Sequence, residues 1–235
     1  MSRNHSTQRC EACDIFQPLC LCNLSPRLQL ATRVVVFMHY RELSLTTNTA
    51  RLAKLALTNC EIRVRGLRGE PVDGKDIVSD THCLPLLLYP SEDSEVLSTK
   101  HRDAARAAGK KIVLIVPDGN WRQGSKGAKR TPGLEHVQCV RLPPGENSEY
   151  RLRTAPRADY LSTFEAIARA VGILEGKDVE DRLMVYFRIK IDRMLWARGL
   201  MPTDEVRGGV PPAAIESFFI AGAKGSQKKT NGESI

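Results

Sequence analysis

Five consecutive apolar residues, Ile112 to Val116, follow a pair of lysines and end at Pro117. An unbroken apolar run that a proline bounds is typical of a strand buried on both faces of a parallel sheet. Asp118 comes next, so we expect a carboxylate at the exit of this strand. In open α/β sheets, ligands bind at the carboxyl ends of the strands. The run therefore predicts an α/β fold with a binding site beside Asp118.

The stretch after this strand combines a glycine, an indole and a basic run. Gly119 allows a tight backbone path, and Trp121 offers a large flat apolar surface. Together with Asp118 and several cations, these groups suit a nucleobase on a phosphate backbone. The cations are Arg122, Lys126, Lys129 and Arg130. The alternative is that Asp-Gly-Asn is an ordinary turn and that Trp121 anchors the core.

Two more apolar runs, residues 34–38 and Leu84–Tyr89, predict buried strands, and a short strand is expected from Ile62 to Val64. His39 follows the first run, where a histidine is more often structural than functional. The exit of the second run carries Pro90, Ser91 and Glu92. Ser91 and Glu92 also suit the first turn of a helix, which we expect from Ser94 to Gly109.

The remaining segments predict three helices, two loops and an exposed strand. Helices are expected from Ala50 to Leu57, from Ser162, which has capping-box spacing to Glu165, and from Asp178 to Arg198. Gly66 to Asp80 is typical of a loop or hairpin, and His136 to Leu142 of a more exposed strand. Tyr150 to Arg157 is basic and contains a proline, which favours an extended loop across the site.

Arginines in two of these segments suggest contacts with RNA. Arg51 lies in the first turn of its helix, where a cation opposes the helix dipole. Such a conflict fits a ligand or a salt bridge, but a solvated arginine is an equal alternative. Arg153 and its basic neighbours could hold phosphates, with a solvated loop as the alternative.

Four cysteines lie close together near the N-terminus, at positions 10, 13, 20 and 22. Two close pairs on a short segment supply four thiolates for a tetrahedral metal site. With no vacant position, Cys10, Cys13, Cys20 and Cys22 predict a structural zinc that folds the N-terminus onto the body. Redox-active cysteines or a disulfide pair are the alternatives.

Composition is compatible with a polyanion partner without proving one. Lys and Arg number 35 against 27 Asp and Glu, which gives a net charge of +8. No stretch of about 18 apolar residues or secretory signal is visible, so we expect a cytoplasmic protein with reduced thiols and no membrane contact. The residues from 222 onward are small, polar and basic, which favours disorder.

The segment Asp118-Gly119-Asn120-Trp121 resembles the Asp-x-Thr-Trp signature of the DTW-domain family, with Asn in place of Thr. Four further blocks are similar to the same family in the same order. They are the cysteine cluster, residues 39–42 with 48–52, Leu88–Asp93, and Leu161–Ala166. The segment 39–42 departs from the family at Tyr40, where proline is common. Five ordered blocks over about residues 10–170 are far more specific than one motif.

The resemblance implies an S-adenosylmethionine-dependent aminocarboxypropyltransferase that acts on a uridine of tRNA. It also implies a mostly parallel sheet flanked by helices, related to the SPOUT methyltransferases, with a trefoil knot on the C-terminal side. We expect a monomer with three parts: a cysteine segment (1–30), the catalytic domain (31–221) and a basic tail (222–235). The expected catalytic residues are Asp118 and Trp121.

Loops at strand exits line the cofactor pocket in SPOUT-like folds, so the resemblance implies binding residues for S-adenosylmethionine at those positions. They are Pro90, Ser91, Glu92, Val116, Pro117, Gly119, Leu152 and Thr163. The expected RNA-binding residues are His39, Arg41, Arg51, Arg122, Lys126, Lys129, Arg130 and Arg153.

Asp118 is the expected base for the weakly acidic uridine N3, or the group that orients the base. A SPOUT-like RNA methyltransferase is one alternative to this function. A zinc-containing RNA-binding protein without catalysis is another. The sequence lacks the aromatic-rich strands on which RNA-binding sheets stack bases, which counts against the second alternative.

Overall fold

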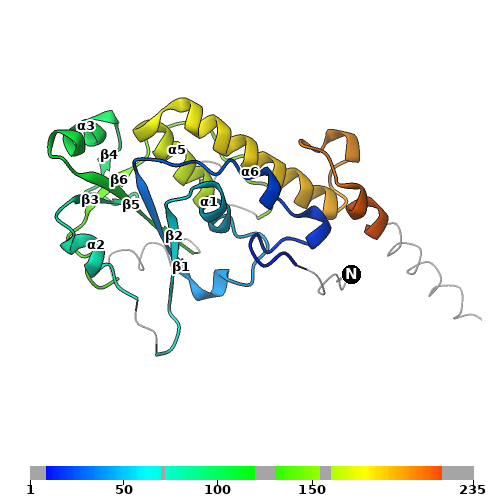
Figure 1. The fold of residues 1–235 in the computed structure, drawn as a ribbon, viewed down its shortest axis with the longest axis horizontal. Coiled ribbons are helices and arrows are strands. Elements are labelled where there is room, and N and C mark those ends of the chain that lie inside the picture. Colours follow the sequence, from blue (N-terminus) through cyan, green and yellow to red (C-terminus); the bar gives the residue numbers. More distant parts are fainter. Residues whose placement is uncertain (1–8, 70–71, 120–130, 154–159, 219–235) are drawn as a thin grey trace, which may run out of the picture.

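A single parallel sheet of six strands organises the computed structural model, which describes residues 9–69, 72–119, 131–153 and 160–218 (Figure 1). The strands run in the order β2-β1-β5-β3-β6-β4, and every registered pair is parallel. Their bounds are β1 Arg33–His39, β2 Cys60–Arg65, β3 Cys83–Leu88, β4 Glu95–Val96, β5 Lys111–Asp118 and β6 Gln138–Arg141. The α/β class and the predicted strands are therefore confirmed.

Helices cover both faces of the sheet. They are α1 Ala50–Ala56, α2 Lys75–Ser79, α3 Thr99–Ala107, α5 Thr163–Glu175 and α6 Lys177–Ala197, with 3-10 turns at Gln17–Leu19, Cys22–Leu24, Tyr40–Glu42 and Thr203–Glu205. On one face, Leu114 and Val116 of β5 pack in a core with residues of α1, α3, α5 and α6. On the other face, Val113 and Ile115 pack with Ile77 of α2. Successive residues of β5 thus face opposite cores, which explains its unbroken apolar run.

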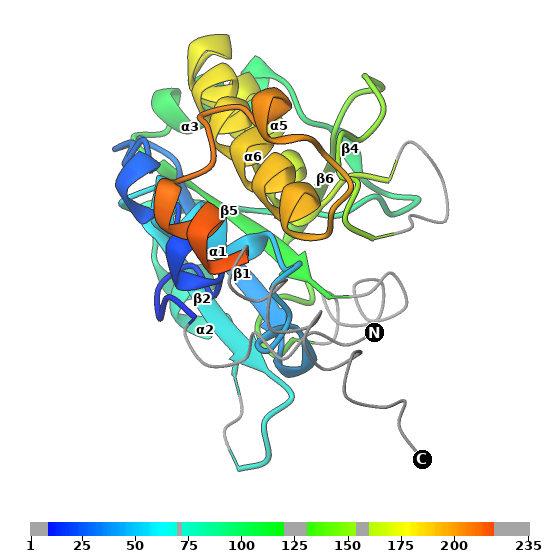
Figure 2. The ribbon, with the colours of Figure 1, turned by 90° about the vertical axis from the view of Figure 1, so that its right-hand side faces the viewer.

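The cysteine segment belongs to the larger core. Ile15, Leu19 and Leu21 are almost fully buried there, together with residues of α5 and α6. The backbone of the C-terminal residues 212–218 is helical, and the ring of Phe218 lies 6.1 Å from the ring of Phe16. Figure 2 shows this last turn, in orange to red, beside the blue N-terminal segment. The two ends of the described chain therefore pack together.

Two predictions about the elements were wrong. The stretch from Gly66 to Asp80, expected as a loop or hairpin, contains the short helix α2. The helix expected from Ser94 begins only at Thr99, where Ser98 and His101 form a capping box. Ser91 therefore caps no helix. Its carbonyl accepts a hydrogen bond from the Ser94 amide in a turn that leads into β4, because the chain adds a short edge strand before it turns helical.

The other predicted helix boundaries agree with the structure within one or two residues. α5 begins at the expected capping box of Ser162 and Glu165, and α6 spans the expected packing helix. In the part of the chain that the structure describes, no helix has both the length and the apolar composition needed to cross a bilayer.

Candidate active site and cysteine cluster

Asp118 is the last residue of β5 and pairs in register with Met38 of β1, so it lies where two central strands end. Its side chain is almost completely buried, with 4% exposed. The Thr163 hydroxyl donates a hydrogen bond to Oδ1 at 2.5 Å, and the Asn48 amide donates to Oδ2 at 2.8 Å. A buried carboxylate is thus held by two neutral donors, with no cation bonded to it among the described residues.

Local sequence fixes the position of Thr163. Ser162 accepts a hydrogen bond from the Glu165 amide, and the Glu165 carboxylate accepts one from the Ser162 amide at 2.8 Å. Glu165 is fully buried and also binds the Glu149 amide and the Ser148 hydroxyl. This capping box satisfies orphan donors of the first turn of α5 and places Thr163 against Asp118.

A second buried carboxylate lies beside this group. Glu42 is 6% exposed and accepts a hydrogen bond from Asn48 Nδ2 at 3.4 Å, so one amide nitrogen serves both Glu42 and Asp118. Arg153 donates to Glu42 Oε2 at 2.9 Å and to the Thr47 hydroxyl at 2.8 Å. The arginine expected to bind RNA therefore has partners within the protein.

Asn48 is anchored from two sides. Its Oδ1 accepts a hydrogen bond from the Arg51 amide at the start of α1, so the amide nitrogen faces the carboxylates. Its backbone carbonyl accepts a hydrogen bond from the Lys190 ammonium of α6. Lys190 is completely buried, and burial lowers its pKa to about 7. The Arg51 guanidinium donates to the Leu43 carbonyl at 2.8 Å, which holds the loop between β1 and α1.

The pKa of Asp118 is raised above its usual value, chiefly because burial disfavours the charged carboxylate. The hydrogen bonds from Thr163 and Asn48 oppose this shift. The negative charge of Glu42 adds to it, and the positive charge of Arg153 acts against it. A carboxylate in this environment is a better proton acceptor than an exposed aspartate, which is what a general base requires.

The exits of β1 and β2 carry an aromatic and basic group. The rings of His39 and Tyr40 lie 4.7 Å apart, and the Arg41 guanidinium lies 5.8 Å from the Tyr40 ring centroid. Burial lowers the pKa of His39, and the charges of Arg65 and Arg41 lower it further. Its Nδ1 accepts a hydrogen bond from the Arg41 amide. This pattern favours a neutral histidine that shapes the loop.

The residues expected to bind S-adenosylmethionine come from β5 and its exit, the segment after β3, the start of α5 and the loop that contains Leu152. Val116 and Pro117 belong to β5, and Thr163 contacts Asp118 directly. Leu87 of β3 pairs in register with Ile115 of β5, and these strands are parallel. Pro90 and Asp118 each lie three residues further along, so both are at the same edge of the sheet. Ser91 Oγ is buried and has no hydrogen-bond partner among the described residues. Glu92 is exposed, Gly119 half-buried and Leu152 buried.

Several expected site residues lie outside the described part of the chain. They are Trp121, Arg122, Lys126, Lys129 and Arg130. Conversely, no pattern in the sequence gave a role to Glu42, Asn48 or Lys190, although Asn48 is hydrogen-bonded to Asp118, to Glu42 and to Lys190. Glu42 and Asn48 lie within blocks that carry the family resemblance, and that position was the only available signal.

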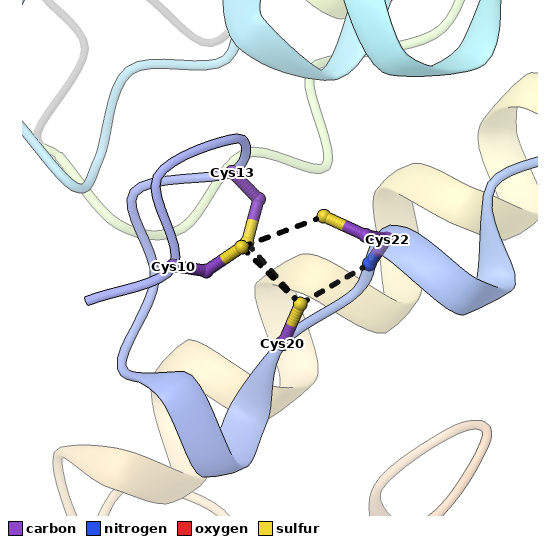
Figure 3. A group of neighbouring side chains, drawn as sticks. All are labelled: Cys10, Cys13, Cys20 and Cys22. Carbon is purple, nitrogen blue, oxygen red and sulfur yellow. Dashed lines mark hydrogen bonds between the residues drawn. The ribbon is translucent and has the colours of Figure 1, made fainter. Parts of the chain in front are cut away.

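The four N-terminal cysteines form the expected cluster (Figure 3). Their Sγ atoms all lie within 4.8 Å of one another, and the closest pairs are 3.5 Å (Cys10 and Cys20) and 3.6 Å (Cys10 and Cys22). Zinc–sulfur bonds of about 2.3 Å give tetrahedral edges of about 3.8 Å, so this arrangement fits a Cys₄ site. All four thiols are unpaired, which argues against a disulfide in this arrangement.

The electrostatics of the cluster also favour a bound cation. Burial raises the pKa of Cys13 and Cys22, and the neighbouring thiols raise both further. Burial opposes deprotonation of Cys10 as well, but the backbone amides of Cys13 and Ala12 lower its pKa to about 7. Four thiolates at this spacing repel one another unless a cation lies between them. Thiolate ligands and tetrahedral spacing are what zinc prefers.

Several known proteins with a similar sequence have names that describe a modification of tRNA. The chain is 28% identical to "tRNA-uridine aminocarboxypropyltransferase 2" of Drosophila melanogaster over 176 residues, which cover 72% of this chain and 67% of that protein. For the Mus musculus protein of the same name, the identity is 28% over 180 residues, 73% of this chain and 58% of that protein. The chain thus spans less than two thirds of the mouse relative.

A plant protein extends this similarity. "tRNA-uridine aminocarboxypropyltransferase A" of Arabidopsis thaliana is 24% identical over 209 residues, which cover 77% of this chain and 78% of that protein. No solved structure matches the chain. The family model described as "DTW domain" matches residues 7–195, which include the cysteine cluster, Asp118, Asn48 and Thr163. Because this match covers most of the chain, the protein belongs to the DTW domain family.

Proposed function

We propose that this protein transfers the 3-amino-3-carboxypropyl group of S-adenosylmethionine to N3 of a uridine in tRNA. The observation that carries the proposal is Asp118: a buried carboxylate of raised pKa at a strand exit of a DTW-domain chain. Relatives whose names state aminocarboxypropyl transfer to tRNA uridine support the same reaction.

Asp118 removes the N3 proton of uridine in this mechanism, or orients the group that does. N3 then forms a bond to the Cγ carbon of the methionine moiety, the bond between Cγ and sulfur breaks, and methylthioadenosine leaves with the electron pair on sulfur. The proton stays on Asp118. The sulfonium has three carbons open to attack, so the pocket has to hold Cγ rather than the methyl group at near-attack distance from N3. Trp121 is proposed to stack on the uracil or to form a wall against the adenosine.

The proposed donor pocket lies around the exits of β3 and β5. Pro90, Ser91 and Glu92 form one side, and Val116, Pro117 and Gly119 form the other, with Leu152 and Thr163 closing it. The unpartnered hydroxyl of Ser91 supports this placement, because a buried hydroxyl without a partner is costly unless a ligand binds it.

The proposed tRNA-binding surface combines the β1 exit with basic residues further along the chain. The loop that contains Asn48 is flanked by His39, Arg41 and Arg51. Arg153 is hydrogen-bonded to Glu42 in the same loop. Arg122, Lys126, Lys129 and Arg130 follow the catalytic strand in sequence. Phosphate contacts of this kind give affinity and position the RNA without reading its sequence.

The cysteine cluster is proposed to hold a structural zinc ion, with Cys10, Cys13, Cys20 and Cys22 as its ligands. A fully occupied Cys₄ site leaves no coordination position for substrate, so its contribution is to folding. The relation to SPOUT methyltransferases, the C-terminal-side knot, the three-part division of the chain, a monomeric state and a cytoplasmic location also remain proposals.

Isotope transfer tests the reaction. Unmodified tRNA is incubated with the protein and S-adenosylmethionine, labelled in one experiment at the carboxyl carbon and in the other at the methyl group. Carboxyl label in the tRNA without methyl label is the expected result. Methyl label alone would identify a methyltransferase, and a protein that binds tRNA without transferring either label would be a binding protein.

The Asp118→Asn variant tests the assignment of the base. We expect it to lose at least a hundredfold in turnover, since general base catalysis typically contributes about 10²–10⁴-fold. The affinity for S-adenosylmethionine, measured by calorimetry, should stay near that of the unaltered protein. Unchanged turnover would refute the role of Asp118.

A further inference from the structure

Two acidic side chains meet at one amide in this site, although a single carboxylate suffices for the proposed chemistry. Asn48 Nδ2 lies 2.8 Å from Asp118 Oδ2 and 3.4 Å from Glu42 Oε2, and all three residues are buried. Like charges this close cannot both ionise without compensation. Among the described residues, a cation is hydrogen-bonded to Glu42 only, since Arg153 donates to both Glu42 oxygens, while Arg153 and Arg65 act on Asp118 through their charge alone.

We propose that Glu42 and Arg153 are positioning residues that act on Asp118 through Asn48: the amide fixes the Asp118 carboxylate, and the ion pair sets how strongly Asp118 holds a proton. This inference rests on the proposed function, in which Asp118 is the base. Arg153 donates hydrogen bonds to both Glu42 oxygens, whereas the donors to Asp118 are the neutral Thr163 hydroxyl and Asn48 amide. The Glu42–Arg153 pair therefore presents both a negative and a positive charge next to the Asp118 carboxylate.

Other ionisable groups also surround Asp118, Glu42 and Asn48. Arg65 of β2 is attracted by Asp118, and His39 and Tyr150 both interact with Glu42. Lys190 of α6 and Arg51 of α1 hold the backbone and side chain of Asn48. Arg153 is the one described cation hydrogen-bonded to either carboxylate, so the Glu42–Arg153 pair is the part of this environment that single substitutions change most directly.

The arrangement predicts opposite effects for two substitutions. Glu42→Gln removes a negative charge next to Asp118 and releases Arg153 toward it, so Asp118 should lose its proton at lower pH. Arg153→Gln removes the compensating positive charge, so Asp118 should lose its proton at higher pH. Each shift should be about one pH unit, the lower end of the range for a neighbouring charge.

Carbon-13 NMR of protein labelled at aspartate Cγ measures this directly. The Asp118 signal is assigned by its absence from Asp118→Asn, and its midpoint is followed in full-length protein without RNA. Glu42→Asp, which keeps the charge, should titrate close to the unaltered protein, and circular dichroism checks that each variant folds. Shifts of the same sign in Glu42→Gln and Arg153→Gln, or no shift in either, would overturn the proposal.

Turnover supplies the second readout. For Glu42→Gln, the acidic limb of the pH–rate profile for carboxyl-label transfer should move to lower pH, with the KM for tRNA unchanged within about twofold. A profile that stays in place while KM rises would mean that Glu42 only supports RNA binding. If the unaltered protein transfers no label, the proposed function fails, while the NMR titration still decides the coupling of Glu42 to Asp118.

Discussion

Removing the proposed zinc ion from the cysteine cluster should undock the N-terminal segment while leaving the sheet intact. The segment from Cys10 to Cys22 buries three large side chains, Ile15, Leu19 and Leu21. Each contributes about 1.5–3 kcal/mol, or about 5–9 kcal/mol together. Ordering the backbone of the segment costs about 13–26 kcal/mol at about 1–2 kcal/mol per residue. Burial alone therefore falls short of the cost.

The binding free energy of a zinc ion would offset the remaining cost of ordering the segment. Structural zinc contributes an apparent binding free energy of about 10–16 kcal/mol, which raises the favourable total to about 15–25 kcal/mol. The segment should therefore be docked with the metal and undocked without it. The sheet should not follow, because its strands pair with one another and also contact α1, α2, α3 and α5.

Hydrogen exchange followed by mass spectrometry checks this. The purified protein should contain one zinc per chain by elemental analysis. After chelation, peptides that span residues 10–22 should exchange as fast as an unfolded chain, while peptides from β5 stay protected. Cys20→Ala should reproduce the effect. Cys139→Ser, which changes a cysteine outside the cluster, should not. Unchanged protection of residues 10–22 in verified metal-free protein would refute the reasoning.

Three further predictions concern stability. Burial raises the pKa of Asp118, so the unfolded state loses this proton first as the pH rises. Relative to Asp118→Asn, the free energy of unfolding of the unaltered protein should therefore fall from about pH 4 upward until the folded-state pKa is passed. Urea unfolding at several pH values measures this difference. Glu165→Ala removes the capping box with Ser162 and leaves buried donors unpaired, so it should cost about 2–4 kcal/mol of unfolding free energy, whereas a loss below about 0.5 kcal/mol would contradict the buried network. Phe164→Ala should cost about 3–5 kcal/mol in the same assay, because the ring is fully buried and stacked 5.8 Å from Phe187; a much smaller cost would mean that the core collapses around the gap.

The sequence predicted the parts of the fold that depend on local pattern. β1, β3 and β5 were visible because strands buried on both faces must be apolar throughout, and α5 because its capping box has fixed spacing. β4 was missed because two residues carry no periodicity, so the prediction started the helix at Ser94. α2 was missed because its five residues lie in a segment rich in Gly and Asp, which favours loops.

The candidate site was predictable only where the chain itself brings residues together. Asp118 could be placed at a strand exit from the apolar run before it. Its contacts with Asn48 and Thr163 depend on which strands are neighbours, and the order β2-β1-β5-β3 cannot be read from periodicity. The same applies to Glu42 and Arg153, which are 111 positions apart and meet only in the folded protein.

Helix α6 contacts both the cysteine segment and Asn48, which binds Asp118. Arg193 of this helix donates to the Cys20 carbonyl at 2.9 Å, and the Tyr186 hydroxyl donates to the Leu21 carbonyl at 3.3 Å. One turn from Arg193, Lys190 binds the carbonyl of Asn48, whose amide holds Asp118. Undocking the cysteine segment would expose this side of α6 to water and weaken the hydrogen bond from Lys190 to the Asn48 carbonyl. We therefore expect loss of the proposed zinc ion to lower turnover through the position of Asp118, although the ion would not touch substrate.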